Sequence, residues 1–375
     1  MGSCLFAGGL CVLLVALSWA GTQHAWGSAA VIAPLVIGFV TLGVCLVYDA
    51  RWAKQPVFPI GLLLRFRDYT VLLLVSFVSG MIYYSMSAIL PQATLYVFTN
   101  DAIEIGVTQI PNGVGQIILG CFVSAMMGKI KHLKLQLIVW MATMTIFSAT
   151  LAAGVAQHKA AFMAVQFFAI GPFPTVASLC YVMASLNAPL RHLGLAMGLI
   201  GTMRSAGGSF GNALLATIWK SLTASRLAPA IIRVGIENGF SPQSTPALIE
   251  AAVLNAVGVP GAYADVPGKV TSEVEEAVMA AFKEVYIYAF QRVFYACLAF
   301  GAVAVIATFF VNDPSKYLTN HTAVHLNEEA HHREQHHAVA ANVTDDSHGQ
   351  SIPMKRPGPG VGVNRIKQNI SSPDT

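Results

Sequence analysis

Apolar residues occur along this chain in long runs that are separated by short polar connections. Most runs reach or exceed the roughly 20 residues that a helix needs to cross the hydrocarbon core of a bilayer. Inside lipid each backbone amide must be bonded within its own segment, so runs of this length predict membrane-spanning helices. The eight predicted spans are residues 4–20, 29–48, 69–97, 104–128, 135–154, 160–186, 193–219 and 286–311.

The amino-acid composition supports this prediction. Of the 375 residues, 55% are hydrophobic and only 11% are charged, whereas a soluble protein carries about 25% charged residues. The net charge of +4 does not indicate a nucleic-acid partner, because the basic residues are spread over short loops and a tail. The six cysteines lie in apolar segments without a CxxC pair, which argues against a disulfide framework or a metal site. We therefore expect an all-α integral, multi-pass membrane protein.

Lysine and arginine are concentrated in short loops, which predicts the orientation of the chain. Residues 51–67 carry four basic residues and residues 129–134 carry three. By the positive-inside rule both loops should face the cytoplasm, and with eight spans both chain ends should do so too. The long connection at 220–285 should then lie outside. Its segments 245–258 and 270–286 have helical periodicity and predict two short helices on the outer surface.

The run 193–219 differs from the other runs because it contains many glycines and one arginine. Since lipid tails are as apolar as leucine, a glycine face is useful only where another backbone approaches closely. At 100° per residue most of these glycines fall on one face of a helix, and the others lie beside it. We therefore predict helix packing through Gly194, Gly198, Gly201, Gly207, Gly208 and Gly211.

Arg204 lies near the middle of that run, where an arginine costs about 2.5–3.5 kcal/mol on insertion scales. It should therefore face protein or a water-filled cavity. Two interpretations remain open. Arg204 either lines a substrate path, or it bonds carbonyl groups of a neighbouring helix and serves packing alone.

Other polar residues at membrane depth are also candidates for a substrate path. Gln109, Asn112 and Gln116 lie on one face of the fourth run, next to a proline that tends to kink the helix. Gln166 precedes the sequence GPFP at 171–174, which suggests a broken helix. Arg292 lies near the outer end of the last run. For the amides the alternative is hydrogen bonding between helices, and for Arg292 it is snorkelling to the membrane surface.

The sequence contains no P-loop and no HExxH motif, so we expect no enzyme, no catalytic residues and no cofactor. Any transport would be secondary. The tail 312–375 is polar, lacks an apolar period and is predicted to be disordered on the cytoplasmic side. It contains His331, His332, His336 and His337, which could bind Zn²⁺ or Ni²⁺ weakly, but we predict no physiological metal site.

Four stretches together resemble a known family. GTMRSAGGSFGNAL at 201–214 resembles the thirteenth helix of fourteen-helix major facilitator proteins, and EIGVTQIPNGVGQIILGCFVSAMMGKI at 104–130 resembles the tenth. Residues 9–40 look like the first of two linker helices of the fungal members, its loop and the following helix. The stretch that starts AFQRVFYACLAF at 289 resembles the last helix of trichothecene-type toxin efflux pumps and, slightly less, of siderophore transporters.

This resemblance implies a fold of two linker helices at 1–68 followed by the C-terminal six-helix bundle of a major facilitator at 69–311. It implies proton-coupled efflux of a toxin, drug or other small hydrophobic molecule, with siderophore-iron transport or a non-transporting fragment as alternatives. On this alignment the chain starts at the family's seventh helix. We therefore expect it to need a missing N-terminal half, or to form a homodimer. The plasma membrane is the expected location, with a vacuolar or vesicular membrane as alternatives.

Overall fold

The computed structural model describes residues 2–20, 23–25, 27–51, 64–189, 192–238, 245–264, 266–267 and 270–317. The chain divides into two compact units, residues 1–318 and 319–375, and all of the described residues belong to the first unit. The histidine cluster and nearly all of the tail predicted at 312–375 therefore lie outside the described residues.

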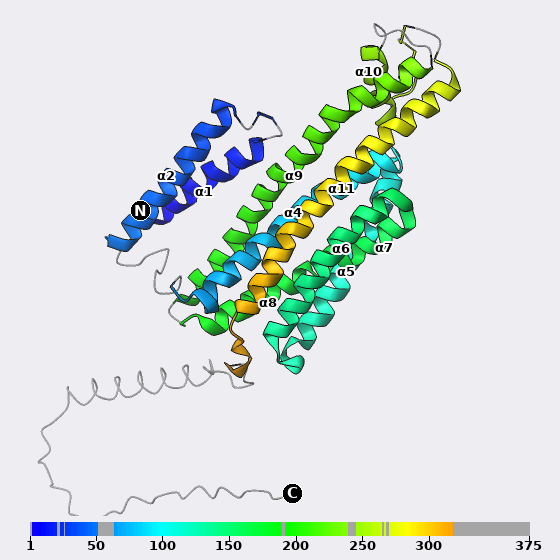
Figure 1. Ribbon diagram of the computed structural model, residues 1–375. Coiled ribbons are helices and arrows are strands. Elements are labelled where there is room, and N and C mark those ends of the chain that lie inside the picture. Colours follow the sequence, from blue (N-terminus) through cyan, green and yellow to red (C-terminus); the bar gives the residue numbers. More distant parts are fainter. Residues whose placement is uncertain are drawn as a thin grey trace, which may run out of the picture. The chain divides into compact units, whose positions relative to one another are not determined.

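The described residues form helices and no β-strand, which confirms the predicted all-α class (Figure 1). A π-helical turn, η1 (Phe66–Thr70), leads into α4, and a short 3-10 helix, η3 (Pro314–Tyr317), follows α11. The α-helices are α1 (Gly2–Trp19), α2 (Ala29–Arg51), α4 (Val71–Val97), α5 (Ala102–Ile130), α6 (Leu133–Gln157), α7 (Lys159–Ile170), α8 (Phe173–Asn187), α9 (Leu193–Glu237), α10 (Thr245–Ala256) and α11 (Ser272–Phe310).

Six helical segments among the described residues are long and apolar enough to cross a membrane. The sequence analysis counted eight, and two of those do not meet both conditions. The apolar part of α1, Cys4–Trp19, is short for a span. Helix α9 has ample length, but its glycines and Arg204 lower its mean hydropathy. The remaining segments are Ala29–Asp49, Phe66–Val97, Ala102–Met127, Leu133–Val155, Lys159–Asn187 and Ser272–Phe310.

The segment Lys159–Asn187 is not one continuous helix. Helix α7 ends at Ile170, and α8 starts at Phe173 after Gly171 and Pro172. Proline has no amide hydrogen and its ring obstructs the preceding turn, so a break is favoured here. Close packing explains the glycine at position 171, because a Cβ there would meet the carbonyl of Phe167 and the backbone of Gly115 on α5.

The structure changes the helix boundaries within the connection predicted at 220–285, and its location outside the membrane stays a prediction. Helix α9 continues to Glu237 and α11 begins at Ser272, giving helices of 45 and 39 residues. At 1.5 Å per residue they are about 68 and 58 Å long, roughly twice the 30 Å hydrocarbon core. We therefore expect both helices to extend beyond the membrane. Apolar residues continue at helical spacing in these outer parts and are buried there. These residues are Leu227, Ile231, Val274, Val278 and Phe282.

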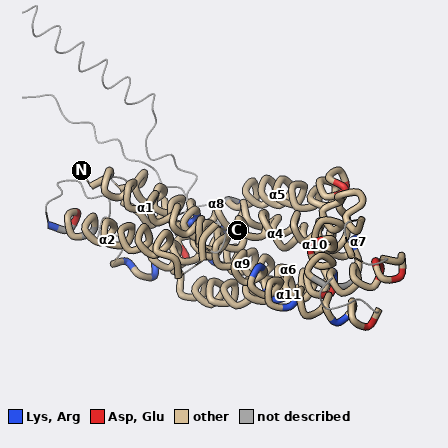
Figure 2. Tube along the Cα trace, turned by 90° about the horizontal axis from the view of Figure 1, so that it is seen from above, with Lys and Arg blue, Asp and Glu red and all other residues tan. Residues whose placement is uncertain are grey.

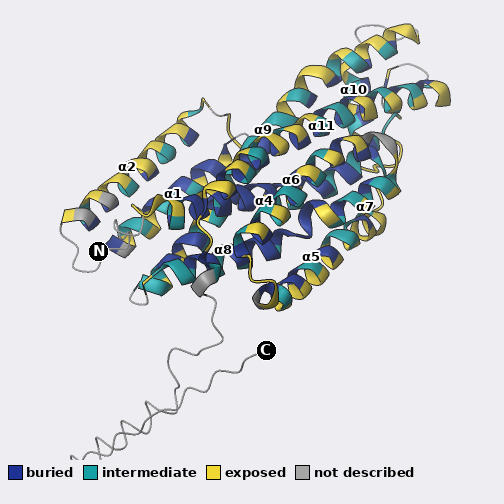
Figure 3. Ribbon diagram, turned by 60° about the horizontal axis from the view of Figure 1, so that its bottom comes forward, coloured by how far each residue is buried: buried dark blue, intermediate teal, exposed yellow. Residues whose placement is uncertain are grey.

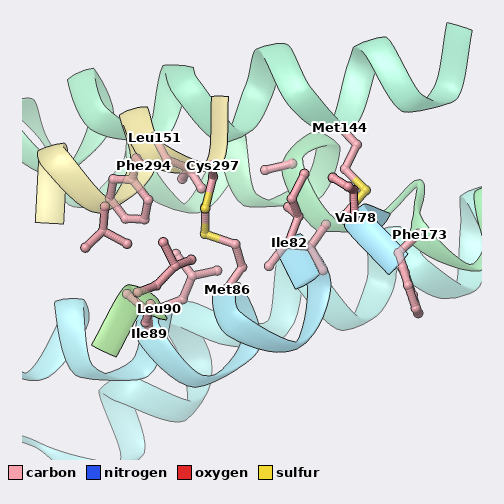
Figure 4. Close-up of a cluster of buried hydrophobic side chains, with 14 of the residues drawn as sticks. Val78, Ile82, Met86, Ile89, Leu90, Met144, Leu151, Phe173, Phe294 and Cys297 are labelled. Carbon is pink, nitrogen blue, oxygen red and sulfur yellow. The ribbon is translucent and has the colours of Figure 1, made fainter. Parts of the chain in front are cut away.

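Helix α4 forms the centre of the bundle and contacts α5, α8, α9 and α11. Figure 3 shows buried residues along α4, whereas α2 and α5 carry stripes of exposed residues. Many of those exposed residues are apolar, as lipid contact requires, and include Ile37, Phe39 and Ile117. Figure 4 shows the core between three helices, where Val78, Ile82, Met86 and Leu90 of α4 lie near Met144 and Leu151 of α6 and near Phe294 and Cys297 of α11.

Charged positions are sparse along the middle of the bundle (Figure 2). At one end the Nε atom of Arg67 donates to the carbonyl of Phe310 at 3.3 Å, and Nζ of Lys134 donates to the carbonyl of Phe309 at 2.8 Å. The start of α4, the start of α6 and the end of α11 therefore lie together. We call this the basic end, and it contains Arg65 and Arg67 of the first basic loop and Lys134 of the second.

Candidate functional site

Helices α4 and α9 approach each other through glycines of both helices. A Cβ at Gly80 of α4 would collide with the carbonyl oxygen of Arg204, and a Cβ at Gly207 of α9 would collide with the carbonyl oxygen of Phe77. A Cβ at Gly211 would lie 2.6 Å from Cγ of Met81, and one at Gly208 would meet the ring of Tyr84. The two backbones are thus in direct contact, which fixes the position of Arg204 along α4.

The packing stripe of α9 is displaced from the face that the sequence analysis favoured. Tyr69 donates to the carbonyl of Ala196 at 2.8 Å and Ser76 donates to that of Ile200 at 3.1 Å. The face of α9 that lies along α4 therefore contains residues 196, 200, 204, 207 and 211. Around the helix from this stripe, a Cβ at Gly201 would lie 3.0 Å from the hydroxyl of Tyr181 on α8. At Gly194 and Gly198 a Cβ would meet nothing within 4 Å, so these two glycines are not packed as expected.

Arg204 lies among aromatic rings of α8. Its Cζ atom is 5.8 Å from the ring centre of Phe173 and 5.2 Å from that of Tyr181, within the range of cation–π interaction. Its Nε atom is buried and has no hydrogen-bond partner among the described residues. Arg204 follows the first residue of α9 by 11 positions, about 17 Å along the axis. This distance is about half of the 30 Å hydrocarbon core, so we expect the guanidinium near mid-membrane depth, and it has no carbonyl partner among the described residues.

The rings connect Arg204 to two of the predicted amides on α5. Tyr83 of α4 stacks on Phe173, with ring centres 3.7 Å apart and planes 3° apart. Its hydroxyl donates to Oε1 of Gln116 at 3.0 Å, and Nε2 of Gln116 donates to Oδ1 of Asn112 at 2.8 Å. The result is a continuous chain of contacts from α9 through α8 and α4 to α5.

We call this set of residues the Arg204 face. All of its polar members are only partly buried, and the neighbouring Tyr84 is 36% exposed. The sequence analysis missed its aromatic members. The adjacent tyrosines in α4 were a visible signal, because hydroxyl groups at membrane depth are unusual. Phe173 could have been noticed because it lies between the two prolines of GPFP, where a broken helix was expected. The Arg204 face consists of Arg204, Phe173, Tyr181, Tyr83, Gln116 and Asn112.

The other three predicted path residues are placed elsewhere. Nε2 of Gln109 lies 3.5 Å from the hydroxyl of Thr94, near the opposite end of α4 from Tyr69. Gln166 of α7 is fully buried, and both of its amide atoms lack partners among the described residues. Arg292 is exposed on α11, where its Cζ atom lies 4.8 Å from the ring centre of Tyr288.

The structure also tests for two other kinds of site, a nucleophile elbow and a metal site. The letters GGSFG at 207–211 fit the GxSxG pattern of a nucleophile elbow, but that elbow is a sharp turn from a strand into a helix. Here the five residues lie inside α9 against α4. Among the described residues no group of three or more His, Cys, Asp and Glu side chains is placed to hold a metal ion.

Comparison with known proteins places this architecture in a family. The family model described as the fungal trichothecene efflux pump matches residues 1–355. The chain is 22% identical over 330 residues to the trichothecene efflux pump TRI12 of Fusarium sporotrichioides, covering 86% of this chain and 54% of that protein. It is 26% identical over 334 residues to the MFS-type transporter prx5 of Penicillium rubens, covering 85% and 58% respectively.

A third relative, the MFS-type efflux transporter ffsH of Aspergillus flavipes, is 25% identical over 313 residues, covering 83% of this chain and 52% of that protein. The chain thus spans about half the length of the curated relatives it matches. These matches confirm the resemblance drawn from the helix motifs. The chain belongs to the fungal trichothecene efflux pump family, as an integral, multi-pass membrane protein.

Proposed function

We propose that this chain supplies one half of a path that exports a small hydrophobic molecule across a membrane, most simply the plasma membrane. The observation that carries the proposal is the Arg204 face. A guanidinium in hydrocarbon costs a few kcal/mol, so its partly exposed position near mid-depth calls for a polar partner. A substrate with a hydrogen-bond acceptor, or a second bundle, can be that partner.

The ring and amide partners of Arg204 suit such a substrate. Phe173 and Tyr83 offer apolar surface, while Gln116 and Asn112 offer hydrogen-bond groups from α5. Transport sites commonly combine a mostly apolar lining with a few convergent polar groups. The alternative that Arg204 only joins helices has less support, because its Nε has no hydrogen-bond partner among the described residues.

A second bundle is part of this proposal. Alternating access in secondary transporters rocks one bundle against another around a site near the midplane. The coverage of about half of each relative fits one bundle of such a pair. The second could come from further sequence of the same polypeptide, from a separate chain or from a second copy. We propose that it also carries the proton, because the acidic residues of this bundle lie at helix ends or in the outer part of α11. Helices α4 and α6 to α8 contain no Asp or Glu, Glu104 lies at the start of α5, Glu237 ends α9, and the glutamates of α11 all precede Tyr288.

Efflux from cells tests the proposal. The full chain is expressed in a toxin-sensitive yeast alone and with the N-terminal six-helix half of a longer relative, and retention of a panel of fluorescent hydrophobic compounds is measured. We expect export from the pair and none from the chain alone. Proton-driven flux in proteoliposomes from a species that cross-linking shows to be monomeric would contradict the need for a second bundle.

A further inference from the structure

A second group of arginines, unrelated to the Arg204 face, surrounds Tyr288 of α11. The Cζ atom of Arg226 of α9 lies 3.9 Å from the ring centre of Tyr288, and that of Arg292 lies 4.8 Å from it. Both arginines are exposed, and neither forms an ion pair within the described part of the chain. Cation–π contact places each guanidinium beside the same ring while its hydrogen-bond donors remain available.

Arg226 and Tyr288 line a groove between α9 and α11 with a volume of about 430 Å³, and Arg292 adjoins this groove through the ring of Tyr288. Arg233 lines the same groove and lies seven positions after Arg226, on the same side of α9. Its Nε atom is 3.9 Å from Glu237 in an exposed pair, which holds it only weakly. Glu284 contributes the one acidic side chain among the groove residues. Positive charge therefore dominates the groove.

The depth of the groove follows from the length of α11. Tyr288 precedes Phe310 at the basic end by 22 residues, about 33 Å at 1.5 Å per residue. This is slightly more than the roughly 30 Å of the hydrocarbon core. Trp219 of α9 lies at this level, with its ring centre 6.3 Å from that of the buried Tyr286, and tryptophan is enriched at the membrane surface. The end of the groove at Tyr288 thus lies at the level of the lipid headgroups, and the rest of the groove extends away from the membrane.

Apolar surface continues from the arginines toward the middle of the membrane. Tyr295 lies three positions after Arg292 and is 50% exposed. Leu298 lies three positions after Tyr295 and is 36% exposed. Residues three positions apart lie about 60° apart around a helix, so Tyr295 adjoins Arg292 and Leu298 adjoins Tyr295. A molecule with its charged group on the arginines could therefore lay a hydrocarbon chain across this adjoining surface of α11.

We propose that this groove binds the headgroup of a membrane phospholipid, with the phosphate on Arg226 and Arg292 and an acyl chain on Tyr295 and Leu298. Guanidinium groups match phosphate oxygens with paired hydrogen bonds. The carboxylate of Glu284 can form an ion pair with the ammonium group of a zwitterionic headgroup. Location at the membrane surface and the adjoining apolar stripe favour a lipid over a free anion.

Binding is tested with the delipidated full chain in detergent. Dioleoyl phosphatidylethanolamine, dioleoylglycerol without a phosphate, and inorganic phosphate are added separately. The unfolding temperature and the bound lipid, counted by native mass spectrometry, are recorded. We expect the phospholipid to bind and raise the unfolding temperature, and the other two to have no comparable effect. Equal effects of dioleoylglycerol would overturn the role of the phosphate. Equal effects of inorganic phosphate would show a soluble-anion site instead.

Variants make the test specific to the arginines. The double substitution Arg226→Gln and Arg292→Gln should weaken phospholipid binding by roughly tenfold, since charge-assisted bonds are lost. Lys220→Gln, an exposed cation on the same helix, should bind like the wild type. Unchanged binding by the double variant would refute the site. If the double variant does not fold, the lipid comparison on the wild-type chain still decides, and it requires no transport activity.

Discussion

Helix α9 holds an arginine against aromatic rings in two places, and the surroundings of the two differ. Around Arg204 the backbones of α4 and α9 touch through glycines, the rings come from α8, and the guanidinium lies near mid-membrane depth. Around Arg226 the ring comes from α11, the side chain is exposed, and the helix has already passed the hydrocarbon boundary.

The comparison shows that the role of an arginine depends on its depth in the membrane and on the backbone contacts around it, and not on its residue type alone. At mid-depth the insertion of an arginine is costly, and the close contact of α4 and α9 holds Arg204 in place. A transported molecule or a second bundle is therefore needed as its polar partner. At the membrane surface the same side chain is inexpensive and can reach lipid phosphate. We therefore propose the transport path for the first position and lipid contact for the second.

The largest expected effect concerns the glycine contact between α4 and α9. Gly207→Leu should greatly reduce folded protein, because overpacking costs about 1–3 kcal/mol even where side chains can yield. Here the opposing group is the carbonyl of Phe77, which cannot move without shifting α4. The monodisperse fraction after detergent extraction measures this effect.

Gly198→Leu is the matched control, since a Cβ at this position meets nothing within 4 Å. It should yield nearly as much folded protein as the wild type. Similar losses from both substitutions would mean that the glycine content of α9, and not its contact with α4, determines folding.

A smaller effect is expected for the amide chain. Gln116→Leu removes the acceptor of the Tyr83 hydroxyl and the donor to Asn112. Loss of such a hydrogen bond typically costs about 1 kcal/mol, so the apparent KM of export should rise roughly fivefold. Gln109→Leu, whose amide lies by Thr94, should leave the KM near the wild-type value. Equal KM values for the two variants would remove Gln116 from the path.

The smallest effect is expected at the membrane surface. Tyr288→Leu removes the ring under Arg226 and Arg292 and should lower the unfolding free energy by about 0.5–1 kcal/mol. Export should stay unchanged, because the ring is outside the proposed path. Thermal unfolding and efflux, measured on the same preparation, check both statements; a strong loss of export would contradict the division between the two parts of α9.

Much of the fold could be predicted because lipid imposes simple rules on a sequence. The run predicted at 193 begins a helix at Leu193, and the run predicted to end at 97 ends one at Val97. The extension of α9 to Glu237 was missed because hydropathy marks lipid contact and does not mark where a helix ends. Beyond the membrane, α9 is stabilised by packing against α11, which a single run of sequence does not reveal.

The Arg204 face could be predicted only in part for a related reason. Spacing placed Asn112 and Gln116 on one side of α5, but helical spacing cannot tell which neighbouring helix faces that side. Tyr83 and Phe173 become relevant only when α4, α5 and α8 meet. The same limit explains Gly194 and Gly198, which share a face with packed glycines but lie away from α4.

One measurement tests the central claim most directly. Export is compared for the wild type, Arg204→Gln and Arg226→Gln in the assembly that transports, with surface expression and monodispersity matched. We predict at least a roughly tenfold loss of export for Arg204→Gln, equivalent to about 1.4 kcal/mol, and near wild-type export for Arg226→Gln. Wild-type export by folded Arg204→Gln protein, or equal losses from both variants, would contradict the assignment of Arg204 to the transport path.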